Sequence, residues 1–502
     1  MPAFQKSLAL GLGLTASLLL TNAHADEFPP GVAHDTVATA CTQCHAAPTV
    51  TSQHKTAAQW TATVRQMMQN GAQVPDDQFD AVVSYLAKNF ADNRAPGARQ
   101  DSDYADYSAV AGKPIQNRSP EKPGERSTFP GQTRAPYKAS APYKTTILTD
   151  KLHSPWALAF LPGGEILITE KRPAAMRLLD ANGTLSAPLK GLSAVSRTPD
   201  FALLDVALDP KFAVNRRLFF TFFEVVQGAA GKPTNSNTYV ASATLDPAGD
   251  ALSDIRVIFR ATPAIPSDRL GLKTGGRIAI SADGTLFVTI GDRSDVTPWD
   301  VAQRLDTDLG KIIHINPDGT PARDNPFIGR PGVLPEIWTY GNRSEEGLAF
   351  RPGTDQLWED EHGPRGGDEL NLIRKGLNYG WPVIAYGIDY DGKPITGGIT
   401  SMPGMEQPVY FWDPVIAPSG LAFYRGDLFP QWKNSVFVGG LRGLLLTRLE
   451  LLGDKVVAEE AMLTNLYAPI RDVRVGPDGA VYVLTDKDSL LKLTPHGGAS
   501  GK

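Results

Sequence analysis

Short strands separated by recurrent tight turns are expected throughout residues 145–495. Three turn sequences each precede a run of apolar or β-branched residues: Pro162-Gly163-Gly164 before 165–169, Ala282-Asp283-Gly284 before 285–289, and Pro477-Asp478-Gly479 before 480–485. Such turns are typical of β-hairpins, and each is expected to lead into a strand with alternating side chains. Hairpins repeated over this length, with few helical patterns, predict a β-propeller of four-stranded sheets. A pair of β-sandwiches is the alternative.

A second motif, Cys41-Thr42-Gln43-Cys44-His45, contains both cysteines of the chain. Two thiols at this spacing can form thioethers to the two vinyl groups of one haem, and the histidine can then bind the iron. A structural zinc site needs further ligands at similar spacing, and a redox dithiol does not require the histidine. The motif therefore predicts haem c held by Cys41 and Cys44 with His45 as an iron ligand. A zinc knuckle and a redox pair are the alternatives.

Residues 1–25 have the pattern of a cleaved signal peptide. Lys6 precedes an apolar run over 8–20, and Ala23-His24-Ala25 is a small-x-small cleavage site. No later stretch reaches the roughly 20 apolar residues of a membrane span, so we expect no transmembrane segment in the mature protein. Bacterial haem c is attached outside the inner membrane, so both features predict a periplasmic protein.

The charge balance excludes one class of partner. The chain has 49 Lys and Arg against 54 Asp and Glu, a formal net charge of −5 at pH 7. This balance provides no basic footprint for nucleic acid, and we predict no nucleic-acid partner.

Residues 26–93 are predicted to form a small all-α cytochrome c domain. Apolar residues recur at helical spacing over 56–70 and 76–90. In the small cytochromes that this segment resembles, a methionine follows a Val-x-x step and precedes Gly-Ala, as Val64, Met67 and Gly71-Ala72 do here. We therefore expect Met67 as the sixth iron ligand, which would raise the haem potential. The other candidates are Met68, His34 and His54. Residues 94–144, rich in Pro, Gly and Ser, are predicted to be a linker.

The predicted propeller carries a series of motifs in a defined order. They are Ser154-Pro155-Trp156-Ala157-Leu158, 203–210 (LLDVALDP), Gly275-Gly276-Arg277 with Gly291-Asp292-Arg293, 361–371 (EHGPRGGDELN), Asn378-Tyr379-Gly380-Trp381-Pro382 and Arg471-Asp472-Val473. Together they resemble the soluble quinoprotein aldose sugar dehydrogenases, the glucose/sorbosone dehydrogenase family. The resemblance implies a six-bladed propeller that holds pyrroloquinoline quinone (PQQ) over a calcium ion and oxidises an aldose to a lactone.

The same resemblance assigns roles to individual residues. PQQ is a flat tricarboxylate, so its site needs cations and a Lewis acid at the quinone oxygen. The resemblance implies PQQ contacts from Arg343, Arg442 and Arg471, with Trp412 flanking the ring system. It also implies calcium ligands from the backbone carbonyls of Gly363 and Pro364, with Asp368 close by.

Several positions depart from the family pattern at the implied site. The family places a histidine, the base that accepts the substrate proton, four residues before the arginine of its Gly-Gly-Arg run, where this chain has Lys273. Asp292 is the expected partner of that histidine. A desolvated lysine can act as a base; alternatively, Lys273 only pairs with a carboxylate. The other departures are Ser344, Pro469 and Asp200.

These features predict a periplasmic quinohaemoprotein dehydrogenase. A sugar or a related alcohol or aldehyde would transfer hydride to PQQ, and the electrons would then pass singly to haem c. A soluble or membrane-bound respiratory carrier would accept them. The alternatives are a haem c electron-transfer or binding protein whose propeller has lost sugar oxidation, and a calcium-dependent lactone hydrolase.

Overall fold

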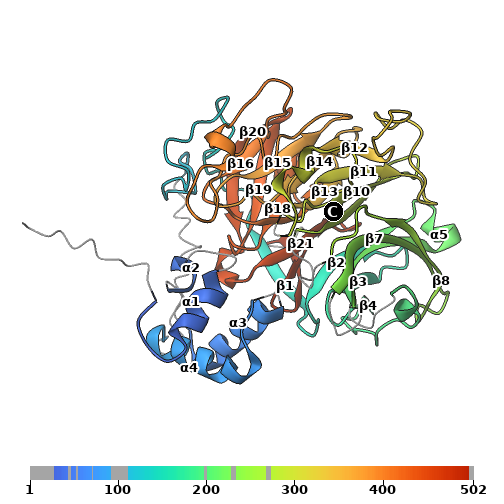
Figure 1. Cartoon of the computed structure of the whole chain (residues 1–502). Coiled ribbons are helices and arrows are strands. Elements are labelled where there is room, and N and C mark those ends of the chain that lie inside the picture. Colours follow the sequence, from blue (N-terminus) through green and yellow to red (C-terminus); the bar gives the residue numbers. More distant parts are fainter. Residues whose placement is uncertain are drawn as a thin grey trace, which may run out of the picture. The chain divides into compact units, whose positions relative to one another are not determined.

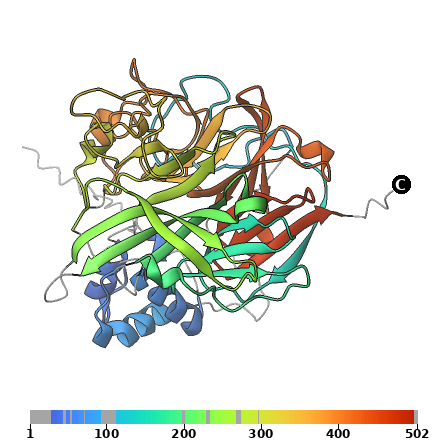
Figure 2. The same cartoon turned by 90° about the vertical axis from the view of Figure 1, so that its right-hand side faces the viewer.

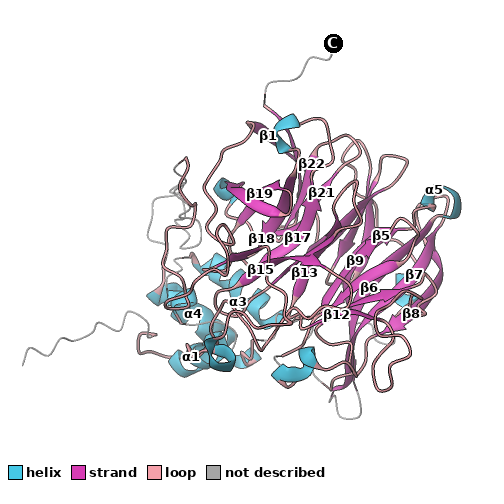
Figure 3. Ribbon diagram, turned by 90° about the horizontal axis from the view of Figure 1, so that it is seen from above, coloured by secondary structure: helices cyan, strands magenta, loops and turns pink. Residues whose placement is uncertain are grey.

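The computed structural model describes residues 28–42, 47–51, 55–69, 72–91, 111–196, 201–227, 233–266, 273–294 and 296–496. Their contacts divide into two compact units. One contains the residues up to 61 together with 74–91, and the other contains 62–73 together with the residues from 111 onward. The first unit is helical, and the second consists mainly of β-sheet (Figure 3).

The N-terminal helices are α1 (His34–Thr42), α2 (Pro48–Thr51), α3 (Ala57–Gln69) and α4 (Phe79–Asn89), with a 3-10 turn at Asp76–Gln78. The helices predicted over 56–70 and 76–90 are therefore present. Helix α4 buries Val82, Val83 and Leu86 on one face. Its C-terminal end is tied to α3, because the Trp60 Nε1 donates a hydrogen bond of 2.9 Å to the carbonyl of Phe90.

The described strands form six sheets around a common axis, so the predicted six-bladed β-propeller is confirmed (Figure 1). Blade 1 contains β2 (Pro155–Phe160), β3 (Ile166–Glu170) and β4 (Ala175–Leu179), and blade 2 contains β5 (Phe201–Leu208), β6 (Arg217–Gln227), β7 (Pro233–Leu245) and β8 (Leu252–Arg260). Blade 3 contains β9 (Gly275–Ile280), β10 (Leu286–Ile290), β11 (Lys311–Ile315) and β12 (Ile337–Tyr340), and blade 4 contains β13 (Glu345–Phe350), β14 (Leu357–Glu361), β15 (Asp368–Ile373) and β16 (Tyr410–Trp412). Blade 5 contains β17 (Pro418–Phe423), β18 (Ser435–Gly440), β19 (Leu445–Leu452) and β20 (Lys455–Met462), and blade 6 contains β21 (Ile470–Val475), β22 (Val481–Thr485), β23 (Ser489–Pro495) and β1 (Tyr143–Thr149). The first strand of each of blades 2 to 6, and β2 of blade 1, form the inner ring. Short helices in the loops are α5 (Phe212–Asn215) and 3-10 turns at Leu192–Ala194, Trp299–Gln303, Ile395–Gly398, Pro430–Trp432 and Thr464–Leu466.

The ring is closed by the two ends of the propeller. Strand β1 pairs antiparallel with β23, with Tyr143 opposite Pro495 and Ile147 opposite Leu491 (Figure 2). The last blade therefore takes its outer strand from the start of the domain. This pairing covers the edge of β23 that would otherwise be unpaired.

The three turn sequences connect the inner strand of blades 1, 3 and 6 to the next strand. Gly164, Gly284 and Gly479 have φ of 92°, 91° and 77°, a region that favours glycine. The strands that follow, however, do not alternate. β3, β10 and β22 are buried along their whole length. Adjacent blades pack face to face and cover both sides of each sheet, so the expected exposed face is absent.

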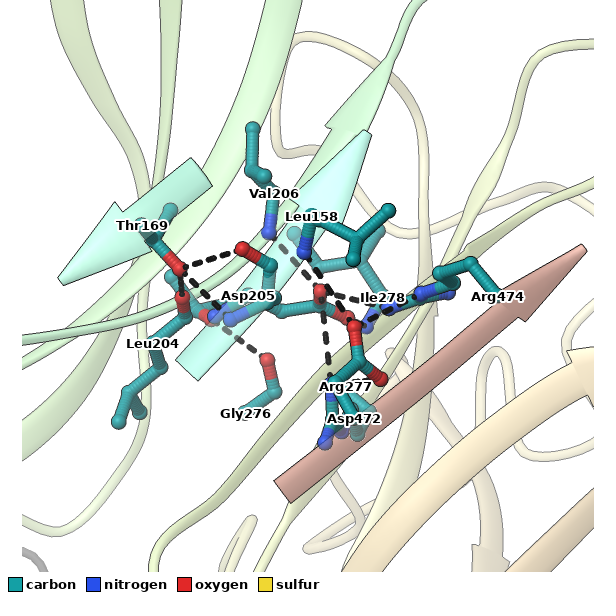
Figure 4. A network of polar contacts seen from close by, with 12 residues as sticks. Leu158, Thr169, Leu204, Asp205, Val206, Gly276, Arg277, Ile278, Asp472 and Arg474 are labelled. Carbon is teal, nitrogen blue, oxygen red and sulfur yellow. Dashed lines mark hydrogen bonds and ion pairs between the residues drawn. The ribbon is translucent and has the colours of Figure 1, made fainter. Parts of the chain in front are cut away.

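A network of buried charges joins the inner strands around the axis (Figure 4). Arg277 on β9 lies 3.1 Å from Asp472 on β21, and Arg474 lies 3.0 Å from both Asp472 and Asp205 on β5. The Arg277 guanidinium also lies 4.0 Å from the centre of the Trp156 ring on β2. Four blades are thereby linked through two arginines and two aspartates.

Residues 111–142, within the predicted linker, lie on the outer strands of blades 4 and 5. The Phe411 N–H donates to the carbonyl of Gln132 at 2.8 Å, and the Lys138 N–H donates to the carbonyl of Glu459 at 3.2 Å. Among the helices of the described residues, none combines the length and the apolarity of a membrane span.

The buried Glu459 on β20 makes the stability of blades 4 and 5 depend on pH. It accepts hydrogen bonds of 2.8 Å from Trp412 Nε1 and from the Tyr410 hydroxyl. Burial raises the pKa of Glu459 to about 7. The folded protein then binds this proton more tightly than the unfolded chain, so the free energy of unfolding falls as pH rises from about 4.5 to about 7.

We expect the Glu459→Gln variant to lose this dependence, because glutamine keeps an acceptor for Trp412 and does not ionise. Relative to wild type, the variant should gain on the order of 2–3 kcal/mol between pH 5 and pH 8 in urea unfolding. Glu450→Gln is the control, since Glu450 in the same blade is partly exposed and pairs with Lys138. Equal pH profiles for Glu459→Gln and wild type would contradict the prediction.

Candidate functional site

Arg343 lies at the centre of a polar group formed by the loops of blades 3 and 4. It follows β12, is almost fully buried, and its Nη1 donates to the carbonyls of His362 and Gly363 at 2.7 and 2.9 Å. Its N–H donates to Glu361 at 2.6 Å. Its guanidinium lies 4.9 Å from the centre of the Trp381 ring. The predicted cofactor arginine is therefore held against a flat aromatic face and a loop of carbonyl oxygens.

Asp292 is joined to this group and to Lys273. Its Oδ2 accepts a hydrogen bond of 2.6 Å from Trp381 Nε1, and its Oδ1 accepts one of 2.9 Å from the Ser294 N–H. Lys273 Nζ donates to the Ser294 hydroxyl at 2.8 Å. The structure thus connects Lys273 to Asp292 through Ser294, whose hydroxyl accepts from the lysine and whose N–H donates to the carboxylate.

The backbone around Lys273 is tightly constrained. Lys273 has φ of 47°, in the left-handed region. A Cβ on Gly291 would lie 2.2 Å from the Lys273 carbonyl oxygen, so only glycine fits there. This close contact constrains the backbone at Lys273 and therefore the direction in which its side chain points.

Asp368 shapes the loop that contains Gly363 and Pro364. Its Oδ1 accepts from the Gly363 N–H at 2.8 Å, and its Oδ2 accepts from the N–H groups of Ile416 and Ala417 at 2.8 and 2.7 Å. Burial raises the pKa of Asp368 to about 7. The side chain therefore ties the loop to the turn before β17.

The other two predicted arginines lie on neighbouring blades. Arg471 on β21 makes a paired contact with Asp486, at 2.9 Å for each nitrogen and oxygen. Arg442 follows β18, and its N–H donates to the carbonyl of Ile416 at 3.0 Å. Arg471 therefore lies on an inner strand, and Arg442 lies beside Ile416, whose N–H is bonded to Asp368.

Trp412 lies in the core between blades 4 and 5, whereas Trp381 lies against the Arg343 guanidinium. Trp412 is on β16, the outermost strand of blade 4, where its ring packs in the core between blades 4 and 5 and its Nε1 is bonded to Glu459. Its position does not support the hypothesis that it flanks the cofactor. Trp381 lines the pocket at Arg343 together with Pro364 and Ala385. The Asn378–Pro382 motif was the available signal for this residue.

His362 is also used structurally. Its Nε2 donates to the carbonyl of Pro418 at 2.7 Å, and burial lowers its pKa. A ring nitrogen engaged in this way is poorly placed to replace the missing base. Among the other departures, Ser344 is buried with its carbonyl bonded to the His362 N–H, and Asp200 lies outside the described residues.

The surroundings of Arg343 supply carbonyl oxygens, which suit calcium, and positive charge, which suits an anionic cofactor. Carbonyl oxygens of the Gly363 loop already face the Arg343 guanidinium, and both carboxylate oxygens of the buried Glu345 have no hydrogen-bond partner. Burial raises the pKa of Glu345 well above its ordinary range. The buried Lys311 ammonium acts in the opposite direction and lowers this pKa, so Glu345 already has a cation nearby. In the described part of the chain, no cluster of three or more His, Cys, Asp or Glu side chains has the arrangement of a metal site.

Fold and site together define a propeller protein whose inner loops present arginine, lysine and an aromatic face. The glucose/sorbosone dehydrogenase model matches residues 152–492. The chain therefore belongs to the glucose/sorbosone dehydrogenase family, and the prediction of an oxidoreductase of this family is confirmed.

Individual relatives agree with this assignment. The chain is 41% identical to the aldose sugar dehydrogenase YliI of Escherichia coli over 365 residues, which cover 72% of this chain and 95% of that protein. The crystal structure of the soluble aldose sugar dehydrogenase of Escherichia coli in the apo form matches with a TM-score of 0.65 at 41% identity, over 71% of this chain and all of that one. The PQQ-bound aldose sugar dehydrogenase of Streptomyces coelicolor matches with a TM-score of 0.55 at 28% identity, over 71% of this chain and all of that one.

Proposed function

We propose that this protein is a PQQ-dependent sugar dehydrogenase that delivers its electrons to a covalently bound haem c. The observation that carries the proposal is the connected group of Lys273, Ser294, Asp292, Trp381 and Arg343 beside the Gly363 loop. The names of the relatives support sugar as the substrate class. When bound, PQQ would supply the hydride acceptor, and calcium would polarise its quinone oxygen.

The chain's own residues would hold and orient these groups. Arg343 and Arg471 supply positive charge for the cofactor carboxylates. Trp381 offers a flat face beside Arg343, and the carbonyl oxygens of Gly363 and Pro364 would face the metal. Lys273, with Ser294 accepting a hydrogen bond from it, is positioned to accept the substrate hydroxyl proton when neutral.

The haem would be attached at the N-terminal motif. Cys41 is in the last turn of α1, and burial raises the pKa of its thiol to about 11. Cys44 and His45 lie outside the described residues. Met67 is in the last turn of α3 and is half-buried. Haem c, export to the periplasm and a respiratory acceptor are proposals that rest on the CxxCH motif and the signal sequence.

A spectroscopic experiment tests both halves of the proposal. The protein, purified with haem incorporated, is given PQQ and calcium and then aldoses, oligosaccharides or alcohols, while the reduced α-band is followed. We expect sugar to reduce the haem. We also expect Cys41→Ala with Cys44→Ala to abolish the α-band while an artificial dye still accepts electrons from sugar, because only the haem attachment is removed. Failure of PQQ to bind and of every substrate to reduce haem or dye would exclude the dehydrogenase.

A second candidate is a haem electron-transfer or binding protein whose propeller no longer oxidises sugar. Replacement of the family histidine by Lys273 is the observation that favours it. A covalent haem spectrum without any substrate-dependent reduction would support this candidate.

A further inference from the structure

The segment 113–138, which we call the strap, forms a closed loop on the propeller (teal, beside β16 and β20 in Figure 1). Its ends are joined by a bridge between Pro114 and Pro136 and by a hydrogen bond of 2.7 Å from the Tyr137 N–H to the Lys113 carbonyl. Gln132 is fully buried, and its Nε2 donates to the carbonyl of Pro408 at 2.9 Å. The strap precedes residues 152–492, the part of the chain that the family model matches.

The strap reaches the loop that carries one wall of the candidate site. Lys122 is 8% exposed, and its Nζ donates to the carbonyls of Ala385 and Gly398 at 2.9 and 3.1 Å. Ala385 lines the pocket at Arg343. A hydrogen bond of 2.9 Å from the Ala385 N–H to the Ile399 carbonyl closes the same loop. The ammonium of Lys122 therefore joins both ends of the segment 385–399.

The strap also holds the Gly363 loop. Arg365 in that loop donates to Glu121 of the strap at 2.7 Å. The N–H and carbonyl of Arg365 pair with those of Ile388 at 3.0 and 2.8 Å, so the two site loops are connected to each other. Residues 121 and 122 thus contact both site loops, the Gly363 loop through Arg365 and the 385–399 loop through Ala385 and Gly398.

Asp413 fixes the strap at this point. Its side chain accepts from the N–H groups of Glu121 and Lys122 at 2.8 and 3.2 Å, and its carbonyl accepts from Arg134 of the strap at 2.8 Å. A Cβ on Gly366 would lie 2.8 Å from the Asp413 carboxylate, so the Gly363 loop also approaches Asp413 closely.

We propose that Lys122 is a positioning residue that holds the 385–399 loop in its binding geometry, so that the strap sets the affinity of the site for its sugar substrate. The affinity part of this inference rests on the proposed function. The Lys122 ammonium is bonded to the backbone carbonyls of Ala385 and Gly398 and lies outside the group of residues that contains Lys273 and Asp292. Its loss should therefore alter binding more than the chemical step.

Lys122→Met tests this proposal because methionine keeps the apolar stem and removes the ammonium. We expect hydrogen exchange of the amides in 386–398 to rise by roughly tenfold, and KM for sugar to rise by roughly tenfold with kcat changed less than about threefold. Lys393→Met is the matched control, since Lys393 lies on the same loop, is 79% exposed and pairs with Asp391. It should leave exchange and KM at wild-type values.

Glu121→Gln is the second variant, should Lys122→Met fail to fold. It removes the ion pair with Arg365 and should raise exchange at Ile388 and in the Gly363 loop. Wild-type exchange in the variants that fold overturns the positioning role, and raised exchange with an unchanged KM overturns the link to affinity. If wild-type protein oxidises no sugar, the proposed function fails, and the exchange measurement alone decides whether the strap holds the loop.

Discussion

Replacing Arg277 by methionine is expected to destabilise the propeller by about 3–5 kcal/mol. Arg277 is 1% exposed and lies between Asp472 and Asp205, at 3.1 and 3.8 Å. Methionine fills much of the same space above the Trp156 ring but leaves Arg474 as the remaining arginine of the network for both carboxylates. A buried charge whose partner has been removed is far more costly than an absent pair.

The destabilisation caused by Arg277→Met should increase with pH. Burial raises the pKa of Asp205, so its carboxyl binds a proton more tightly in the folded protein than in the unfolded chain. Removing a neighbouring cation raises this pKa further. We therefore expect the destabilisation by Arg277→Met to be larger at pH 8 than at pH 5, where protonation relieves the unpaired charge.

Urea unfolding followed by tryptophan fluorescence measures both effects. Arg304→Met is the control, because Arg304 is about half exposed and pairs with Asp306 two residues away; it should unfold close to wild type. The stability of Arg277→Lys should lie between those of Arg277→Met and Arg304→Met, because lysine keeps the charge but loses the contacts of the planar guanidinium. A variant Arg277→Met as stable as wild type would show that the network does not hold the blades together.

Removing the Lys273 side chain is expected to have the largest effect on activity. If Lys273 accepts the substrate proton, Lys273→Ala should lower kcat by about 10²–10⁴-fold, the usual contribution of a general base. The Ser294→Ala variant should have a smaller effect, because Ser294 only receives a hydrogen bond from Lys273 and links it to Asp292.

The pH profile separates a base from a structural cation. Lys273→His introduces the histidine that the family carries at this position, so the rising limb of kcat/KM should move to the histidine range, near pH 6.5. Steady-state kinetics with PQQ and calcium from pH 5 to 10 measures this shift. Lys190→Ala is the control, since Lys190 is 76% exposed and pairs with Asp250. Wild-type turnover in Lys273→Ala would remove the lysine from the mechanism.

Much of the site could be predicted from motifs because each motif is a local loop. Arg343, Gly363, Asp292 and Lys273 all lie in short segments whose backbone geometry the residues themselves specify, as Gly291 does for Lys273. These segments lie together because they flank strands of two neighbouring blades: β9 and β10 of blade 3, the connection from β12 to β13, and β14 of blade 4. Collinear motifs in a propeller therefore predict proximity well.

The choice between two tryptophans could not be made from the sequence. Trp381 is followed directly by Pro382, and Trp412 is followed by Asp413-Pro414. The fold places Trp381 beside Arg343 and Asp292, but it places Trp412 on the outermost strand of blade 4, bonded to Glu459. Nothing local to either residue determines which end or edge of the blade it occupies.

The strap is a second example of this limit. Its Pro, Gly and Ser content is typical of a linker, yet Gln132 is fully buried and Lys122 nearly so, with its ammonium bonded to two distant carbonyls. Those carbonyls lie 263 and 276 residues further along the chain.

The sequence by itself determined the hairpin turns, the order of the motifs and the family, because turn chemistry and strand patterns act over a few neighbouring residues. Only the tertiary structure decided which strands are buried on both faces and which tryptophan contacts Arg343. It also decided that the strap holds the loops of the site. Those outcomes depend on blades packing against each other and on the partners that neutralise buried charges, which are contacts between residues far apart in the chain.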